Sequence, residues 1–312
     1  LGNVVRNSQP EVPALWWTQQ MQVLHAPEQL GPYVGCALVP TMGALHAGHR
    51  ALMRRMSGRG MPVLATVFVN PTQFAPREDF AKYPRTLADD VKLAEECGAD
   101  AVFAPSAETI YPFGLDAARA EAAAWLLPDV ANQPRLEDAN RPTHFGGVCQ
   151  VVARLFDLTQ PAMAVFGEKD FQQLRVLEDM AAMARAADGR WGALVIEAAP
   201  TVREHDGLAM SSRNRYLQPE QRDRALALVR ALQHAAAATD PPSAERIMRT
   251  TLEAHGLTVD YAVVRHASTL LPVNDWNAPT RALIAARIGD VRLIDNMAMP
   301  IRGHLGEPAG QG

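Results

Sequence analysis

The chain has 312 residues, of which 48% are hydrophobic and 21% are charged, so it can form one large globular unit or two ordinary domains. Its formal net charge is −4 and it has no basic block, so we expect no nucleic-acid partner. The longest largely apolar run, residues 63–69, is too short to cross a bilayer, so we expect no membrane partner.

Cysteine usage favours a reducing compartment. Cys36, Cys97 and Cys149 are an odd number at wide spacings, and they form neither a disulfide framework nor a C-x-x-C site. No signal-peptide pattern opens the sequence. We therefore expect a cytoplasmic protein.

The first third of the chain, after about 30 poorly patterned residues, alternates predicted strands and helices. An apolar run at 34–39 predicts a strand that turns through glycines into an amphipathic helix. Residues 61–69 predict a strand buried on both faces, and a loop through Pro76 and Pro84 follows. A helix is expected from Thr86, with a capping box to Asp89, and a strand at 101–104. This β-α-β-α-β order predicts an α/β fold with a doubly wound parallel sheet.

The same alternation continues to about residue 200. Helices are expected at 117–127 and 144–158, and strands at 163–166 and 193–198. The strand at 163–166 runs into Gly167-Glu168-Lys169-Asp170 and a helix that carries Gln172 and Gln173. Both strand-to-helix turns lie at the carboxyl edge of a parallel sheet, where ligands bind at the switch in strand order. Residues 43–49 and 167–173 can therefore face one pocket.

The chain changes character near Thr201, where we place a domain boundary between residues 1–201 and 202–312. A donor-rich polar loop at 203–215 comes first. Helices are then predicted at 219–238 and 243–255, separated by Asp240-Pro241-Pro242, and strands at 258–264, 282–287 and 291–294. These elements form a small α+β domain, and residues after Arg302 are expected to be a tail.

The turn at 39–49 contains the first candidate chemistry, the sequence H-x-G-H at His46 to His49. A helix N-terminus with free N–H groups attracts anions, and two imidazoles on its first turn can donate to phosphate or carry a proton. Two blander interpretations remain open. A zinc site would need a third ligand, and both histidines could be ordinary residues at a helix start. The chain lacks a P-loop and a usable G-x-G-x-x-G, so any nucleotide must bind by another loop.

H-x-G-H followed by a later M-S-S-R resembles the nucleotidyltransferase superfamily, in which these two segments close on ATP. The longer motifs resemble the pantothenate synthetase (pantoate–β-alanine ligase) family over nearly the whole chain. They are V-P-T-M-G-A-L-H-A-G-H (39–49), F-V-N-P-T-Q-F (68–74), Y-P-R-T (83–86), R-P-T-H-F (141–145), F-G-E-K-D-F-Q-Q-L (166–174), D-G-L-A-M-S-S-R-N-R-Y-L (206–217) and R-L-I-D-N (292–296). The resemblance implies a Rossmann-like fold whose C-terminal domain closes over the site.

The resemblance also implies a two-step reaction, with pantoate, β-alanine and ATP as substrates and Mg²⁺ as cofactor. Pantoate attacks ATP to give pantoyl-adenylate, and β-alanine then displaces AMP. A homodimer is implied as well. Two alternatives are kept: an adenylyltransferase of this superfamily acting on another acceptor, and a non-catalytic nucleotide-binding protein.

Roles carried over by the resemblance fall into four groups. The catalytic residues are His46, His49, as the proton donor, and Lys169. The ATP-binding residues are Met42, Gly43, Ala44, Leu45, His46, Ala47, Gly48, His49, Gly167, Glu168, Lys169, Asp170, Val202, Met210, Ser211, Ser212 and Arg213. Gln73 and Gln173 hold pantoate, Gln73 also touches β-alanine, and Asn70, Arg141 and His144 border the pocket.

Mg²⁺ is predicted beside Asp89 and Asp90. The alternative for this pair is that the acidic side chains stabilise the first turn of a helix without any metal. Surface amides, a solvent-facing turn and loop residues likewise remain the alternatives for the glutamines, for Met210–Arg213 and for Arg141 with His144.

Overall fold

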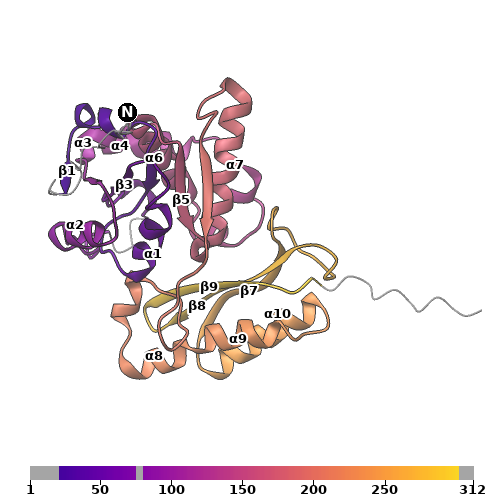
Figure 1. The fold of residues 1–312 in the computed structure, drawn as a ribbon. Helices are drawn as coiled ribbons and strands as arrows, with labels where there is room; N and C mark the ends of the chain where they lie inside the picture. Colours follow the sequence, from indigo (N-terminus) through magenta and orange to yellow (C-terminus); the bar gives the residue numbers. More distant parts are fainter. Residues whose placement is uncertain (1–20, 75–79, 302–312) are drawn as a thin grey trace, which may run out of the picture.

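Two sheets organise the chain (Figure 1). The computed structural model describes residues 21–74 and 80–301. The first sheet has six parallel strands in the order β1-β4-β3-β2-β5-β6. They are β1 (Gln22–Leu24), β2 (Ala37–Val39), β3 (Val63–Thr66), β4 (Ala101–Phe103), β5 (Met163–Gly167) and β6 (Val195–Ala199). The doubly wound parallel sheet is confirmed.

Helices cover both faces of this sheet. On one face α1 (Ala47–Met56) and α2 (Leu87–Glu96) pack on Ala37 and Val39, while Leu38 faces the other cluster, beneath α6 (His144–Thr159) and α7 (Phe171–Asp188). The strands are short because residues buried on both faces must be apolar throughout. α4 (Leu115–Ala123) packs on α6, and the short helices α3 (Ala107–Ile110) and α5 (Glu137–Asn140) lie in the connection between β4 and α6.

The strand order reverses between β2 and β5. From β2 the chain moves outward through β3 to β4, whereas from β5 it moves the other way to β6. β2 and β5 are hydrogen-bonded neighbours, with Ala37 opposite Met163. The turns that follow them therefore lie side by side at the carboxyl edge of the sheet, as predicted.

The second sheet is antiparallel, in the order β7-β8-β9, and its strands are β7 (Thr258–His266), β8 (Thr280–Ile288) and β9 (Val291–Ala298). α9 (Ala227–Ala235) and α10 (Pro241–Ala254) pack on one face of it, and α8 (Pro219–Ala225) precedes them. In Figure 1 this sheet lies across one end of the parallel-sheet unit, with α9 and α10 on the side away from it. The boundary near Thr201 stays a prediction.

Local predictions differ from the structure in three places. The helix predicted at 219–238 is divided at Leu226 into α8 and α9. The prolines at 241 and 242, predicted to break a helix, occupy the first turn of α10, where their missing N–H groups cost nothing. Thr86 does precede α2, but its hydroxyl donates to Asp90 rather than closing the predicted capping box with Asp89.

Some predictions fall outside the described residues, namely those on Pro76 and on the tail after Arg302. β1 lies in the stretch that had no predicted pattern. Among the described residues, the structure contains no helix with both the length and the apolar character needed to cross a membrane.

Candidate active site

The turn after β2 is held by two side chains from neighbouring elements. Gly43 and Ala44 both adopt left-handed backbone, with φ of 78° and 51°. The Thr41 hydroxyl accepts from the Gly43 N–H at 3.1 Å and donates to the Thr66 carbonyl. The carboxylate of Asp90, which is 2% exposed, accepts from the N–H groups of Ala44 at 3.1 Å and Leu45 at 2.7 Å. These bonds stabilise a backbone conformation that a non-glycine residue adopts only at a cost.

His46 and His49 lie against each other at the start of α1, with ring centroids 4.2 Å apart. The Gly48 N–H donates to His46 Nδ1 at 3.1 Å, and the His46 N–H donates to His49 Nδ1 at 3.3 Å. A side chain at position 48 would meet the His46 ring, because an added Cβ would lie 2.8 Å from its Cε1 atom. The glycine of H-x-G-H thus makes room for the first imidazole.

Both imidazoles are neutral near pH 7. Burial, followed by the positive charge of Lys169, lowers the pKa of His46 to about 4. Burial, followed by the neighbouring His46, lowers the pKa of His49 to about 3. Since each Nδ1 accepts a backbone hydrogen bond, the neutral ring carries its proton on Nε2. Each ring therefore has one N–H donor left for a ligand.

The turn after β5 presents Lys169 and Asp170, whose charged atoms lie 3.6 Å apart. Burial acts to raise the pKa of Asp170, but the charges of Lys169 and Arg213 outweigh it and hold that pKa below its ordinary value. Glu168 points away from this pair and bonds Arg281 of β8 at 2.8 Å. Lys169 and Asp170 thus supply opposite charges at the same edge where the histidines lie.

The polar loop after β6 folds back on itself. The Met210 N–H donates to the Val202 carbonyl at 2.9 Å, and Arg203 pairs with Ala209 in an isolated bridge. The Ser211 side chain then accepts from the Arg213 N–H and opens the short 3-10 helix Ser212–Tyr216. This hairpin-like arrangement explains how Val202 and Met210, eight residues apart in the numbering, can both face one ligand.

Of the predicted pantoate residues, Asn70 is engaged entirely by the protein. Its amide donates to Gln73 Oε1 at 3.1 Å and to the Gly147 carbonyl, and its Oδ1 accepts from Thr72 and Tyr111. Asn70 therefore orients Gln73. Position 147 must be glycine, because a Cβ there would lie 2.5 Å from the Thr72 backbone.

Gln172 and Gln173 separate into two roles. Gln172 is buried and bonds the Val130 carbonyl, Asp138 and the Glu137 N–H. Gln173 lines the cavity, and within the described residues its amide has no hydrogen-bond partner. Arg141 and His144 lie beside it and bond each other at 3.1 Å.

One cavity of about 250 Å³ joins these segments. His49 and Lys169 both line it, so the two distant turns meet in space. The other predicted residues on its wall are Met42, His46, Gly48, Gly167, Asp170, Val202, Met210, Ser211, Ser212, Arg213, Asn70, Gln73, Gln173 and Arg141. Absent from the wall are Gly43, Ala44, Leu45, Ala47, Glu168, Asp89 and Asp90.

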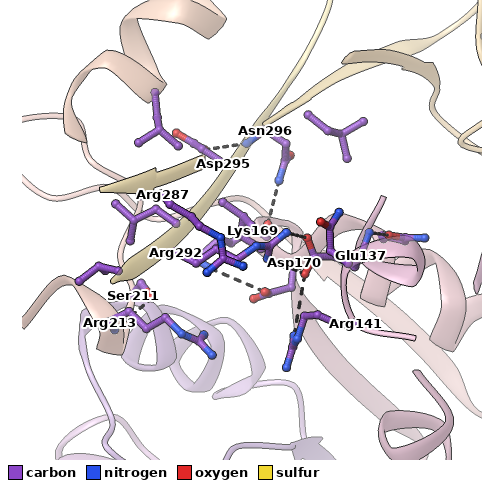
Figure 2. Close-up of a pocket in the computed structure, with 18 of the residues that line it drawn as sticks. Glu137, Arg141, Lys169, Asp170, Ser211, Arg213, Arg287, Arg292, Asp295 and Asn296 are labelled. Carbon is purple, nitrogen blue, oxygen red and sulfur yellow. Dashed lines mark hydrogen bonds and ion pairs between the residues drawn. The ribbon is translucent and has the colours of Figure 1, made fainter. Parts of the chain in front are cut away.

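A second, larger cavity of about 720 Å³ adjoins the first and opens toward β9 (Figure 2). Arg141, Lys169, Asp170 and Arg213 line both cavities. Figure 2 shows Glu137 and Arg292 facing this space from opposite sides. Arg292 donates to both carboxylate oxygens of Glu137, at 2.7 and 2.8 Å, and joins the units built on the two sheets.

Sequence reasoning missed the apolar wall of the smaller cavity. Phe68, Phe74 and Tyr83 come from loops, and Val148, Val151, Val152 and Leu155 come from one stripe of α6. The i, i+3, i+4 and i+7 spacing on α6 was a visible signal, but it equally predicts a helix face in the core. Burial raises the pKa of Tyr83, which also bonds Ser212 of the polar loop.

Asp89 and Asp90 do not converge on a common point. Asp89 is exposed on α2, whereas Asp90 turns inward and spends its carboxylate on the Ala44 and Leu45 N–H groups. Among the described residues, no three His, Cys, Asp or Glu side chains cluster as a metal site. Asp90 therefore supports the turn, and a magnesium site at this pair stays a prediction.

Residues 18–298 match the protein family described as Pantoate-beta-alanine ligase. The pantothenate synthetase of Bradyrhizobium sp. is 48% identical over 269 residues, which cover 84% of this chain and 90% of that protein. The pantothenate synthetase of Rubrobacter xylanophilus is 47% identical over 279 residues, or 86% of this chain and 92% of that protein.

Solved structures agree with this match. Pantothenate synthetase from Thermus thermophilus superposes with a TM-score of 0.80 at 40% identity, over 90% of this chain and 100% of that one. Pantoate-beta-alanine ligase from Francisella tularensis, described as complexed with beta-gamma ATP and beta-alanine, has a TM-score of 0.71 at 29% identity, over 89% and 98%. Because the family match and these relatives extend over most of its length, the chain belongs to the pantoate–β-alanine ligase family.

Proposed function

We propose that this chain joins pantoate to β-alanine with ATP, through a pantoyl-adenylate held between the turns after β2 and β5. Membership of the family gives the overall reaction. The observation that carries the proposal is that both turns and the 202–213 loop line one cavity, at the strand-order switch where α/β sheets bind ligands. ATP and β-alanine, with which the Francisella tularensis relative is described as complexed, are the ligands we assign to it.

In the first step a carboxylate oxygen of pantoate bonds the α-phosphorus of ATP, and the bond from that phosphorus to the bridging oxygen of pyrophosphate breaks. Negative charge grows on the departing pyrophosphate. Lys169, Arg213 and the Ser211 and Ser212 donors line the cavity and neutralise this charge. The protein's contribution is positioning and electrostatic stabilisation rather than covalent chemistry.

His46 and His49 act as neutral hydrogen-bond donors in this step. The resemblance implies that His49 donates a proton, but a pKa of about 3 leaves almost no imidazolium at pH 7. Donation from Nε2–H to phosphate oxygens needs no charged ring, and it stabilises charge as the transition state forms. We therefore assign both rings this role.

In the second step the β-alanine nitrogen bonds the acyl carbon, the bond from that carbon to the phosphate oxygen breaks, and AMP leaves. The amine loses its proton to solvent. Gln73 and Gln173 hold pantoate through both steps, with Arg141 at the border. Asn70 orients Gln73 so that its amide nitrogen remains available, since the Met42 sulfur is the one partner that this nitrogen has among the described residues.

Magnesium would bring its charge to the triphosphate and keep most of its water ligands. Asp89 and Asp90 do not fit as its ligands, because the first is remote from the cavity wall and the second is committed to backbone N–H groups. We therefore route no step through the metal. The homodimer and closure of residues 202–312 over residues 1–201 are further proposals, and the family resemblance supports them.

The test is to supply purified protein with ATP, β-alanine and pantoate labelled in its carboxylate oxygen. Labelled AMP, pyrophosphate and pantothenate are expected, because the attacking oxygen stays on phosphorus when the amine displaces AMP. ADP release or unlabelled AMP would contradict the adenylate. AMP transfer to a nucleotide or phosphopantetheine acceptor would instead favour the adenylyltransferase alternative.

A further inference from the structure

The Lys169 turn is held by a side chain from the second sheet. Asn296 of β9 is 4% exposed, and its amide nitrogen donates to the carbonyls of Glu168 and Lys169, both at 2.9 Å. Figure 2 shows this amide directed toward the Lys169 segment across the larger cavity. The position of the Lys169 backbone therefore depends on a residue more than a hundred positions later in the chain.

Arg281 determines which way the Asn296 amide faces. Its Nε donates to Asn296 Oδ1 at 2.6 Å, so the amide nitrogen must face the two carbonyls. The same guanidinium bonds Glu168 at 2.8 Å and stacks over the Phe171 ring, 3.9 Å from its centroid. A planar guanidinium with these three contacts has little freedom to rotate.

The preceding residue of β9 holds the other phosphate-facing segment. Asp295 accepts from Arg203 through both carboxylate oxygens, at 2.7 and 2.9 Å. Arg203 lies in the loop that pairs Val202 with Met210. Successive side chains of a strand leave on opposite sides, so one step of β9 reaches both segments.

We propose that Asn296, oriented by Arg281, is a positioning residue that sets Lys169 relative to the loop at 202–213. This rests on the proposed role of Lys169 at the phosphates. Asn296 touches no reacting atom and acts only through the Lys169 turn. Catalytic groups displaced by about 1 Å lose roughly 100-fold in rate, so loss of the two amide bonds should be visible in turnover.

The experiment is a double-mutant cycle on full-length protein with saturating ATP, pantoate and β-alanine. Asn296→Ala should lower kcat by about 10- to 100-fold, the scale for losing a residue that orients a catalytic group, with little change in KM for pantoate. In a Lys169→Ala background the same change should cost less than about 3-fold, because its target is gone. Asn274→Asp, at an exposed site of the same unit, is the control and should match wild type.

Equal losses in the two backgrounds would make Asn296 a general structural residue and overturn the inference, as would a wild-type rate for Asn296→Ala. A wild-type rate for Lys169→Ala would instead overturn the proposed role of Lys169, and this inference with it. If the alanine variant does not fold, the nearly isosteric Asn296→Asp enters the same cycle. It removes both N–H donors and turns an oxygen toward the carbonyls, so the same losses are expected.

Discussion

Asp90→Asn separates two roles for one carboxylate, holding the turn after β2 or binding magnesium. The native carboxylate accepts from two N–H groups, at 2.7 and 3.1 Å, and from the Thr86 hydroxyl at 3.3 Å. An asparagine has one acceptor oxygen, so its NH₂ group must face either the Ala44 or the Leu45 N–H. One buried backbone donor then loses its partner, which costs about 1–3 kcal/mol.

This cost lies in a strained turn. Ala44 has a φ of 51°, a conformation that costs a non-glycine residue about 1–2 kcal/mol and persists only while its surroundings hold it. If the variant turn relaxes, the competent conformation becomes a minority state, and a bias of 1–2 kcal/mol corresponds to roughly 5- to 30-fold. The apparent Kd for ATP should rise by about that factor.

The assay is equilibrium binding of ATP by calorimetry, once with excess Mg²⁺ and once in a chelator. A residue that holds the turn weakens binding in both conditions by a similar factor. Asp89→Asn, at an exposed position of the same helix turn, should leave both Kd values unchanged. Asp90→Asn with wild-type binding in the chelator and weakened binding only with Mg²⁺ would refute the reasoning and identify a metal ligand.

Three further predictions concern the histidines and the contact between the sheets. His49→Ala should keep the fold and lower kcat by roughly 100- to 1000-fold, the cost of one transition-state donor, whereas the exposed His234→Ala should not; equal rates would remove His49 from the mechanism. Because His46 and His49 have native pKa values of about 4 and 3, the unfolded chain binds their protons first as the pH falls below about 6.5. The free energy of unfolding should therefore drop between pH 6.5 and 4, and the drop should be smaller when both are glutamine; denaturant titrations with equal slopes would contradict this. Glu137→Ala leaves a buried arginine unpaired and should cost about 3–5 kcal/mol of unfolding free energy, against at most about 1 kcal/mol for Glu253→Ala in an exposed pair; equal costs in urea would count against a buried clamp.

Some elements could be predicted from local pattern alone. The strand, glycine turn and helix around His46 follow from an apolar run, flexible residues and helical spacing within about twenty positions. β1 could not be predicted in this way, because three residues with a polar first member have no readable alternation. The division of α8 from α9 at Leu226 also lacks a signal, since neither glycine nor proline marks it.

The candidate site shows the same division between near and distant causes. The prediction that residues 43–49 and 167–173 face one cavity could be made, because parallel strands place their following turns at one edge. The role of Asp90 could not, since an acidic residue in a first helical turn predicts only helix stabilisation. Asn70 was likewise predicted to hold pantoate, and only its bonds to Gln73 and Gly147 assign it to support.

The sequence by itself determined the order of strands and helices, the two polar turns, and the motifs that identify the family. Those features depend on interactions between residues a few positions apart, which the pattern of side chains records directly. Tertiary structure alone decided which polar groups are used up by the protein and which stay available to a ligand. Asp90 meets Leu45 across 45 positions and Asn296 meets Lys169 across 127, and contacts over such distances depend on how whole layers pack.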